Sequence, residues 1–188
     1  MRWSVFLVAA LLVTALDGSL MGLFSVGGTA PSLAPLLVVF VAMHAPRPTA
    51  MWAGMLVGLL ADLSTPLVDG TLRPIHLIGP AALGYLFAVN LVLPLRSMVL
   101  RRNPLTLVVL VALASFGCGL VITAIWTARS LLGESIDPFG GRSAAGELAL
   151  VSLRGALSGA AALPMGWLLM KSAPIWGFQS GGSRMMRW

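Results

Sequence analysis

Hydrophobic residues in this chain run together in long stretches, and polar residues gather mainly in the short segments between them. Apolar runs that approach the length of a bilayer crossing are typical of helices that face lipid, whereas a helix on the surface of a soluble protein repeats its apolar positions on one face only. The pattern predicts six membrane-spanning helices, over residues 3–24, 31–45, 49–63, 75–95, 105–128 and 148–170.

The second and third segments are shorter than the other four. At a rise of about 1.5 Å per residue each would be about 22 Å long, against about 30 Å for the hydrocarbon core of a bilayer. A re-entrant hairpin would place Arg47 at its tip inside the membrane, at a cost of at least about 2.5 kcal/mol. Two short spans joined by a surface turn are therefore favoured, since Pro46 and Pro48 would end one helix and begin the next.

The composition agrees with a membrane protein. Of 188 residues, 58% are hydrophobic and 10% are charged, whereas soluble domains have about 25% charged residues. We therefore expect an all-α integral membrane protein with one polytopic domain over residues 1–175 and a flexible cytoplasmic tail over residues 176–188. The first run could be a signal peptide cleaved near Ala15, but its apolar character resumes after Asp17, which favours an uncleaved span.

The basic residues give the predicted spans a direction. With the amino terminus in the cytoplasm, more Lys and Arg residues fall in cytoplasmic segments than in outer loops, as the positive-inside rule requires. The cytoplasmic set is Arg2, Arg47, Arg96, Arg101, Arg102, Lys171, Arg184 and Arg187, and the outer set is Arg73, Arg129 and Arg142. No basic stretch is interleaved with aromatic residues, so the net charge of +6 indicates topology and argues against nucleic-acid binding.

The third predicted span carries a stripe of small residues. Ala50, Gly54, Gly58 and Asp62 follow one another at steps of four, which places them along one helix face. Small residues there allow another helix to approach closely. Asp62 could cap a neighbouring helix, pair with a cation or line a polar pocket. An anchor between helices is favoured over a transport or catalytic carboxylate.

Arg154 lies well inside the last predicted span, about 10 Å from its outer start. Asp17 and Asp62 fall in the same outer half of the membrane, so the sequence predicts an intramembrane ion pair between Arg154 and one of these acids. The last span also carries Gly155 and Gly159, a second small-residue face. Its spacing favours helix packing and leaves open whether the contact is internal or with a partner subunit.

Few residues offer catalytic or metal-binding chemistry. His44 and His76 fall at opposite membrane faces in this topology, so they cannot share a metal ion or act together in acid–base catalysis. Cys118 is the single cysteine, which excludes an intramolecular disulfide and a thiolate cluster. The sequence also has no Gly-rich phosphate loop. We therefore expect no catalytic residues, no metal and no cofactor.

The second and third predicted spans, with the helix that follows, resemble a known family. An apolar helix over residues 35–41 and a proline turn precede the run Gly54-Met55-Leu56-Val57-Gly58-Leu59-Leu60-Ala61-Asp62-Leu63, and the next helix carries Gly84-Tyr85-Leu86. This order is similar to that of the rod shape-determining MreD family, in which a Gly-x-x-x-Gly-Leu-Leu-x-Asp-Leu segment precedes a loop and a helix with a Gly-Tyr-Leu element. The resemblance is specific over residues 31–95.

The resemblance implies a non-enzymatic scaffold of the cell-wall elongation machinery that helps to maintain cell shape, multi-pass in the bacterial inner membrane with both termini cytoplasmic. It implies binding to an MreC-like single-span protein, beside an MreB-like filament and wall synthases. The family's fold is similar to the substrate-binding subunit of energy-coupling-factor transporters. Gly54, Gly58 and Asp62 match the family motif and are the expected structural or interface residues.

An alternative is a small-solute transporter or a substrate-binding membrane subunit. In that case Asp17, Asp62 and Arg154 would line an outward-facing pocket. An enzyme acting on lipid-linked substrates is less favoured, because such sites need clustered acids or histidines and those of this chain are scattered.

Overall fold

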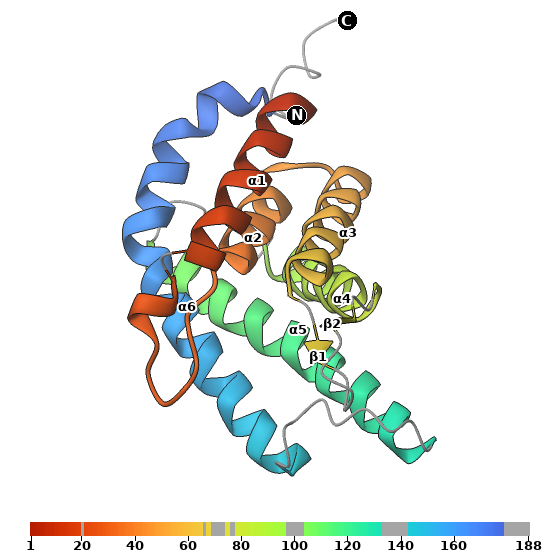
Figure 1. The fold of residues 1–188 in the computed structure, drawn as a ribbon. Helices are drawn as coiled ribbons and strands as arrows, with labels where there is room; N and C mark the ends of the chain where they lie inside the picture. Colours follow the sequence, from red (N-terminus) through yellow and green to blue (C-terminus); the bar gives the residue numbers. More distant parts are fainter. Residues whose placement is uncertain are drawn as a thin grey trace, which may run out of the picture.

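The computed structural model describes residues 1–19, 21–65, 67–68, 74–75, 78–96, 104–132 and 143–178. Within these ranges the fold is helical apart from one very short strand pair (Figure 1). The helices are α1 (Trp3–Ser19), η1 (Met21–Phe24), α2 (Ala34–His44), α3 (Arg47–Ser64), α4 (Pro80–Leu95), α5 (Pro104–Leu131), α6 (Ala144–Ser172) and η2 (Ala173–Trp176), and the strands are β1 (Leu67–Val68) and β2 (Pro74–Ile75). The predicted all-α class is confirmed at this level.

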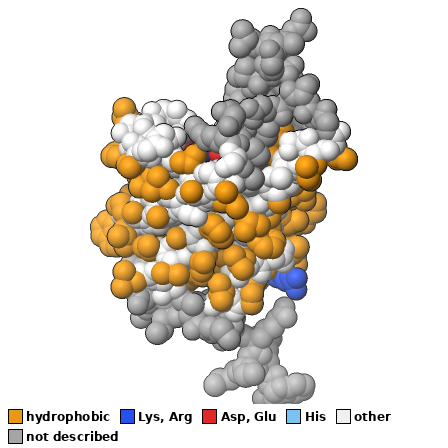
Figure 2. Space-filling model, turned by 90° about the horizontal axis from the view of Figure 1, so that it is seen from below, with side chains coloured by type: hydrophobic (Ala, Val, Ile, Leu, Met, Phe, Trp, Pro, Cys, Tyr) orange, Lys and Arg blue, Asp and Glu red, His pale blue; other side chains and the backbone are white. Residues whose placement is uncertain are grey.

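Two helical segments are long and apolar enough to cross a membrane, Leu105–Leu131 and Ala145–Trp176. The helices α1, α2 and α4 are apolar but shorter. Large hydrophobic side chains are exposed on the outside of the bundle, and Figure 2 shows a face that they dominate. A surface of this kind is compatible with a lipid environment.

The boundaries of two predicted spans were wrong. The first, residues 3–24, is divided, because α1 ends at Ser19 and η1 is a separate turn. The fourth was expected to begin at Ile75, but Ile75 lies in β2 and α4 begins at Pro80. Proline is favoured at the first position of a helix, where its missing N–H costs nothing. Gly79 before it has a φ of 134°, a conformation that side chains rarely adopt.

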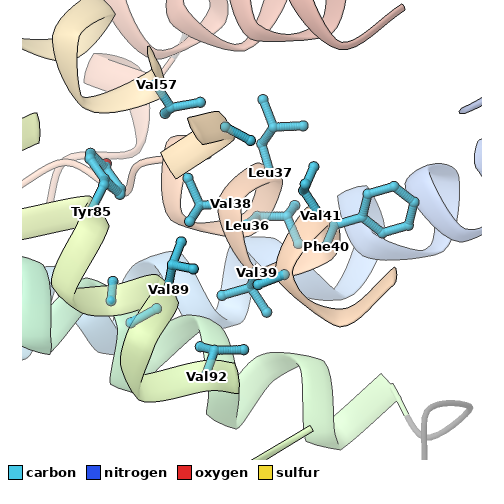
Figure 3. Packing of buried hydrophobic residues seen from close by; sticks show 14 of the residues in the cluster. Leu36, Leu37, Val38, Val39, Phe40, Val41, Val57, Tyr85, Val89 and Val92 are labelled. Carbon is cyan, nitrogen blue, oxygen red and sulfur yellow. The ribbon is translucent and has the colours of Figure 1, made fainter. Parts of the chain in front are cut away.

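The short helix α2 is the centre of the bundle. All its residues from Ala34 to Met43 are buried, and it contacts α1, α3, α4, α5 and α6. Its side chains, such as Leu37 and Val39, pack against Val57 of α3 and Val89 of α4 (Figure 3). A helix that is apolar on all sides is stable only when it is surrounded. The protein encloses α2, which explains its apolar character without direct contact with lipid.

The amino terminus lies against the carboxyl end of the described chain. The backbone N–H of Arg2 donates a hydrogen bond of 2.9 Å to the carbonyl oxygen of Trp176. Trp176 is 2% exposed, and its ring centroid lies 5.1 Å from that of Phe40 and 5.9 Å from that of Phe178. Packed structure thus continues to Phe178, beyond the predicted domain boundary at residue 175. The remainder of the predicted tail, residues 179–188, lies outside the described residues.

Candidate functional site: capping carboxylates and an arginine-lined cavity

The glycine stripe of α3 packs directly against α4. A Cβ atom added at Gly58 would meet the Cα atom of Ala82 and lie 2.6 Å from the carbonyl oxygen of Ala81. One added at Gly54 would lie 2.7 Å from Cγ2 of Val89. Backbone atoms cannot rotate aside as a side chain can, so glycine at position 58 permits the close approach of the two helices. The stripe therefore forms a contact between two helices of the same chain.

Asp62, at the end of this stripe, caps the next helix. Its carboxylate accepts hydrogen bonds from the backbone N–H groups of Gly79 at 2.8 Å, Ala81 at 3.0 Å and Ala82 at 3.3 Å. Pro80 has no N–H to offer, so the carboxylate binds the amides around it that no helical carbonyl can reach. A negative charge at the amino end of a helix is also stabilised by the helix dipole. The sequence left three roles open for Asp62, and in the structure it caps a neighbouring helix.

Asp17 serves the central helix in the same way. Its carboxylate accepts hydrogen bonds from Leu33 N at 2.7 Å, Ala34 N at 3.2 Å and the hydroxyl of Ser32 at 2.7 Å. The backbone N–H of Ser32 donates in turn to the hydroxyl of Ser158 on α6, at 2.9 Å. These bonds join the start of α2 to both α1 and α6.

The opposite end of α2 is held by a basic side chain. Arg96 donates from Nη1 to the carbonyl oxygens of Ala42 at 3.0 Å and Ala45 at 2.8 Å. The buried helix therefore has a carboxylate at its amino end and a guanidinium at its carboxyl end. Both charges have the sign that the helix dipole favours. Sequence reasoning counted Arg96 among the cytoplasmic charges and missed this role.

The two capping acids occupy equivalent positions in the chain. Each lies two residues before the end of its helix, and each binds a backbone N–H 17 residues further on, from Asp17 to Ala34 and from Asp62 to Gly79. A shared signal is present in the sequence, since each acid is followed two residues later by a serine and further on by a proline in the first turn of the next helix. Sequence reasoning considered a cap for Asp62 alone, and it missed that Asp17 repeats the same arrangement.

The predicted ion pair of Arg154 is not formed. Among the described residues, Arg154 makes no ion pair with Asp17 or Asp62, because backbone amides at two helix starts occupy both carboxylates. The structure nevertheless brings Arg154 and Asp17 to the wall of one cavity, of about 360 Å³. Asp62 is hydrogen-bonded to the first turn of α4, which contributes Ala81 to the same cavity, so it lies at the same end of the bundle.

The second small-residue face, on α6, is also used internally. A Cβ atom added at Gly155 would lie 3.1 Å from the carbonyl oxygen of Ala112, and one added at Gly159 would lie 3.1 Å from that of Val108. Both neighbours belong to α5. The sequence left open whether this face contacts the same chain or a partner subunit. In the structure the contact is internal, since these glycines allow α5 and α6 to pack together.

The residues considered for metal or redox chemistry lie apart. No group of three or more His, Cys, Asp or Glu side chains able to hold a metal ion occurs in the part of the chain that is described. His44 lies at the end of α2 away from the capping acids, stacked on Phe178, and His76 lies outside the described residues. Cys118 is buried against α4, where a Cβ added at Gly84 would lie 2.7 Å from its Sγ.

No protein-family model matches the sequence, and neither a curated protein nor a solved structure matches the chain. Its function is therefore argued from its own residues and their geometry.

Proposed function

We propose that the chain is a non-enzymatic membrane scaffold of the cell-wall elongation machinery, similar to the MreD family. In this proposal it is multi-pass in the bacterial inner membrane, has both termini in the cytoplasm and binds an MreC-like single-span protein beside wall synthases and an MreB-like filament. The observation that carries the proposal is that the residues matching the family motif all make contacts between helices of the chain. Gly54 and Gly58 bring α3 against α4, and Asp62 fastens the start of α4, so the motif builds a frame.

Close glycine contacts continue across the bundle. Gly84 of the Gly-Tyr-Leu element meets Cys118 on α5, and Gly155 and Gly159 meet the backbone of α5 from α6. Helices whose backbones touch have little freedom to slide, because their packed side chains interdigitate at short range. The four helices from α3 to α6 thus form a continuous series of close contacts. Such a series suits a protein that holds partners at fixed positions.

The ends of α5 and α6 support a membrane setting for this frame. With 28 and 29 residues, these helices are about 42–44 Å long, which matches the 40–45 Å of a bilayer with its headgroups. Arg129 lies over the ring of Trp126 near the end of α5, and Lys171 lies 3.7 Å from the ring centroid of Trp167 near the end of α6. Tryptophan and basic residues are enriched at membrane interfaces.

A partner helix would meet side chains that the bundle leaves exposed. Leu11 on α1, Trp52 on α3 and Leu120 on α5 are each more than 40% exposed, whereas Val39 on α2 is fully buried. Gly58 is not a suitable probe of such a contact, because a side chain there would clash inside the molecule. Photo-crosslinking residues at the three exposed positions, with Val39 as the buried control, separate partner contact from loss of fold.

We expect the affinity-tagged chain, extracted from its own cells in mild detergent, to retain a single-span protein that mass spectrometry identifies. At least one of the exposed positions should crosslink to that protein, and the Val39 position should not. Recovery of a folded chain without any partner, with no crosslink at any of the three positions, would contradict the scaffold function. That result would favour the alternative of a solute-binding membrane subunit.

A further inference from the structure

The cavity of about 360 Å³ lies among the helices at the end of the bundle where the two acids cap α2 and α4. Its wall is contributed by all six helices from α1 to α6 and by the segment before α2. The polar side chains on the wall include Asp17, Ser32, Tyr85, Ser115, Arg154 and Ser158. Small-molecule sites have volumes of about 300–1,000 Å³ and a few converging polar groups on a largely apolar wall. This cavity has both properties.

Ser115, on the wall of the cavity, has a buried hydroxyl group. Its side chain is 8% exposed, and its hydroxyl has no hydrogen-bond partner among the described residues. Buried polar groups in folded proteins almost always have a partner, since an unsatisfied one costs about 1–3 kcal/mol. Because Ser115 lies on the wall of the cavity, its hydroxyl is available to hydrogen-bond a molecule that enters there, water included.

The charges on the wall indicate the chemistry of that molecule. The carboxylate of Asp17 is engaged by Ser32 and by the first amides of α2, so it has little capacity left for a cation. Arg154 makes no hydrogen bond or ion pair with the residues described, and its guanidinium carries five N–H donors. An unpaired cation at membrane depth is costly. Among the described residues of the wall, Arg154 is thus the charged group whose hydrogen-bonding capacity is unused, and its donors suit an anion.

We propose that this cavity binds a small molecule with an anionic group, a phosphate or a carboxylate, which Arg154 contacts through its guanidinium and Ser115 through its hydroxyl. A guanidinium matches such groups because it can donate two parallel hydrogen bonds to two oxygen atoms. The anion is carried either by a free solute or by a lipid headgroup that enters from the bilayer. This proposal rests on the membrane setting proposed above but not on the scaffold role, since it concerns a separate surface of the chain.

The solute arm measures binding of inorganic phosphate and of glycerol 3-phosphate to the full chain in nanodiscs of zwitterionic phosphatidylcholine. We expect the chain to bind at least one of these probes. Arg154→Gln should weaken that binding by at least about tenfold, since hydrogen bonds to charged groups contribute about 1.5–3 kcal/mol. Ser115→Ala should weaken it by a smaller factor. Arg47→Gln, the same change at the opposite end of the bundle, should leave it unaltered.

The lipid arm uses nanodiscs of anionic phosphatidylglycerol and native mass spectrometry after extraction. Retention of phosphatidylglycerol by the wild type and by Arg47→Gln, with its loss in Arg154→Gln, would identify a headgroup as the source of the anion. Elution volume and melting without ligand verify that each variant is folded, and Arg154→Lys replaces Arg154→Gln if the latter is not. The proposal is overturned if neither probe nor lipid binds, or if every bound species is indifferent to Arg154 and Ser115.

Discussion

Gly58→Ala is expected to destabilise the folded chain by at least about 2 kcal/mol. Overpacking costs about 1–3 kcal/mol, and a clash with backbone belongs at the upper end because the atoms cannot rotate aside. Alanine regains up to about 1 kcal/mol through its higher helix propensity. The added Cβ would meet Ala82 Cα and lie 2.6 Å from the carbonyl oxygen of Ala81. Thermal unfolding in detergent should show a clearly lower midpoint than for the wild type.

Two further glycines serve as matched controls. A Cβ added at Gly18 on α1 would have nothing within 4 Å, so Gly18→Ala should leave the midpoint unchanged or raise it slightly. Gly54→Ala should fall between the two, since the nearest atom is a methyl group of Val89 that can move. If Gly58→Ala unfolds at the same temperature as Gly18→Ala, the close packing of α3 on α4 is incorrect.

Asp62→Ala is expected to cost about 3 kcal/mol, because three backbone N–H groups at the start of α4 would lose their acceptor. For a chain of this length that loss corresponds to a fall of about 6–12 °C in the melting midpoint. Asp62→Asn keeps one acceptor oxygen but loses the charge, so it should have an intermediate effect. Circular dichroism during heating in detergent would measure all variants on one scale.

Ser64→Ala is the control for that series. Ser64 lies on the same helix, is exposed and donates only to the carbonyl of Leu60 one turn earlier. Its replacement should change stability by no more than about 0.5 kcal/mol. Equal melting of Asp62→Ala and Ser64→Ala would show that the carboxylate does not hold α4.

The sequence predicted the helical class from the length of its apolar runs, and it predicted the shared face of the α3 stripe from the four-residue spacing of its members. Helix capping by Asp62 was among the predicted roles, since a carboxylate at the end of a close-packed stripe faces a neighbouring helix. The partners of Arg96 could not be predicted. Its acceptors at the carboxyl end of α2 are backbone carbonyls more than 50 residues earlier, and every residue has a backbone carbonyl, so the sequence does not single these two out.

The error at Arg154 has a related cause. Charges were matched with opposite charges, although backbone N–H groups at a helix start compete for a carboxylate and are already in place. The burial of α2 on all sides was also not predicted. Its enclosure by five helices depends on long-range packing, and an apolar segment has the same composition whether protein or lipid surrounds it.

The proposed membrane-spanning arrangement is tested most directly by labelling the two ends of α6 with a membrane-impermeant maleimide. The only native cysteine, Cys118, is buried, so the wild type should stay unlabelled in the folded state. Ala145 and Pro174 are exposed near opposite ends of this segment, which makes Ala145→Cys and Pro174→Cys a matched pair. Ala145→Cys should react in intact spheroplasts, and Pro174→Cys should react only after the membrane is opened. Labelling of both positions from the same side would contradict a membrane crossing by α6 and the cytoplasmic placement of the termini.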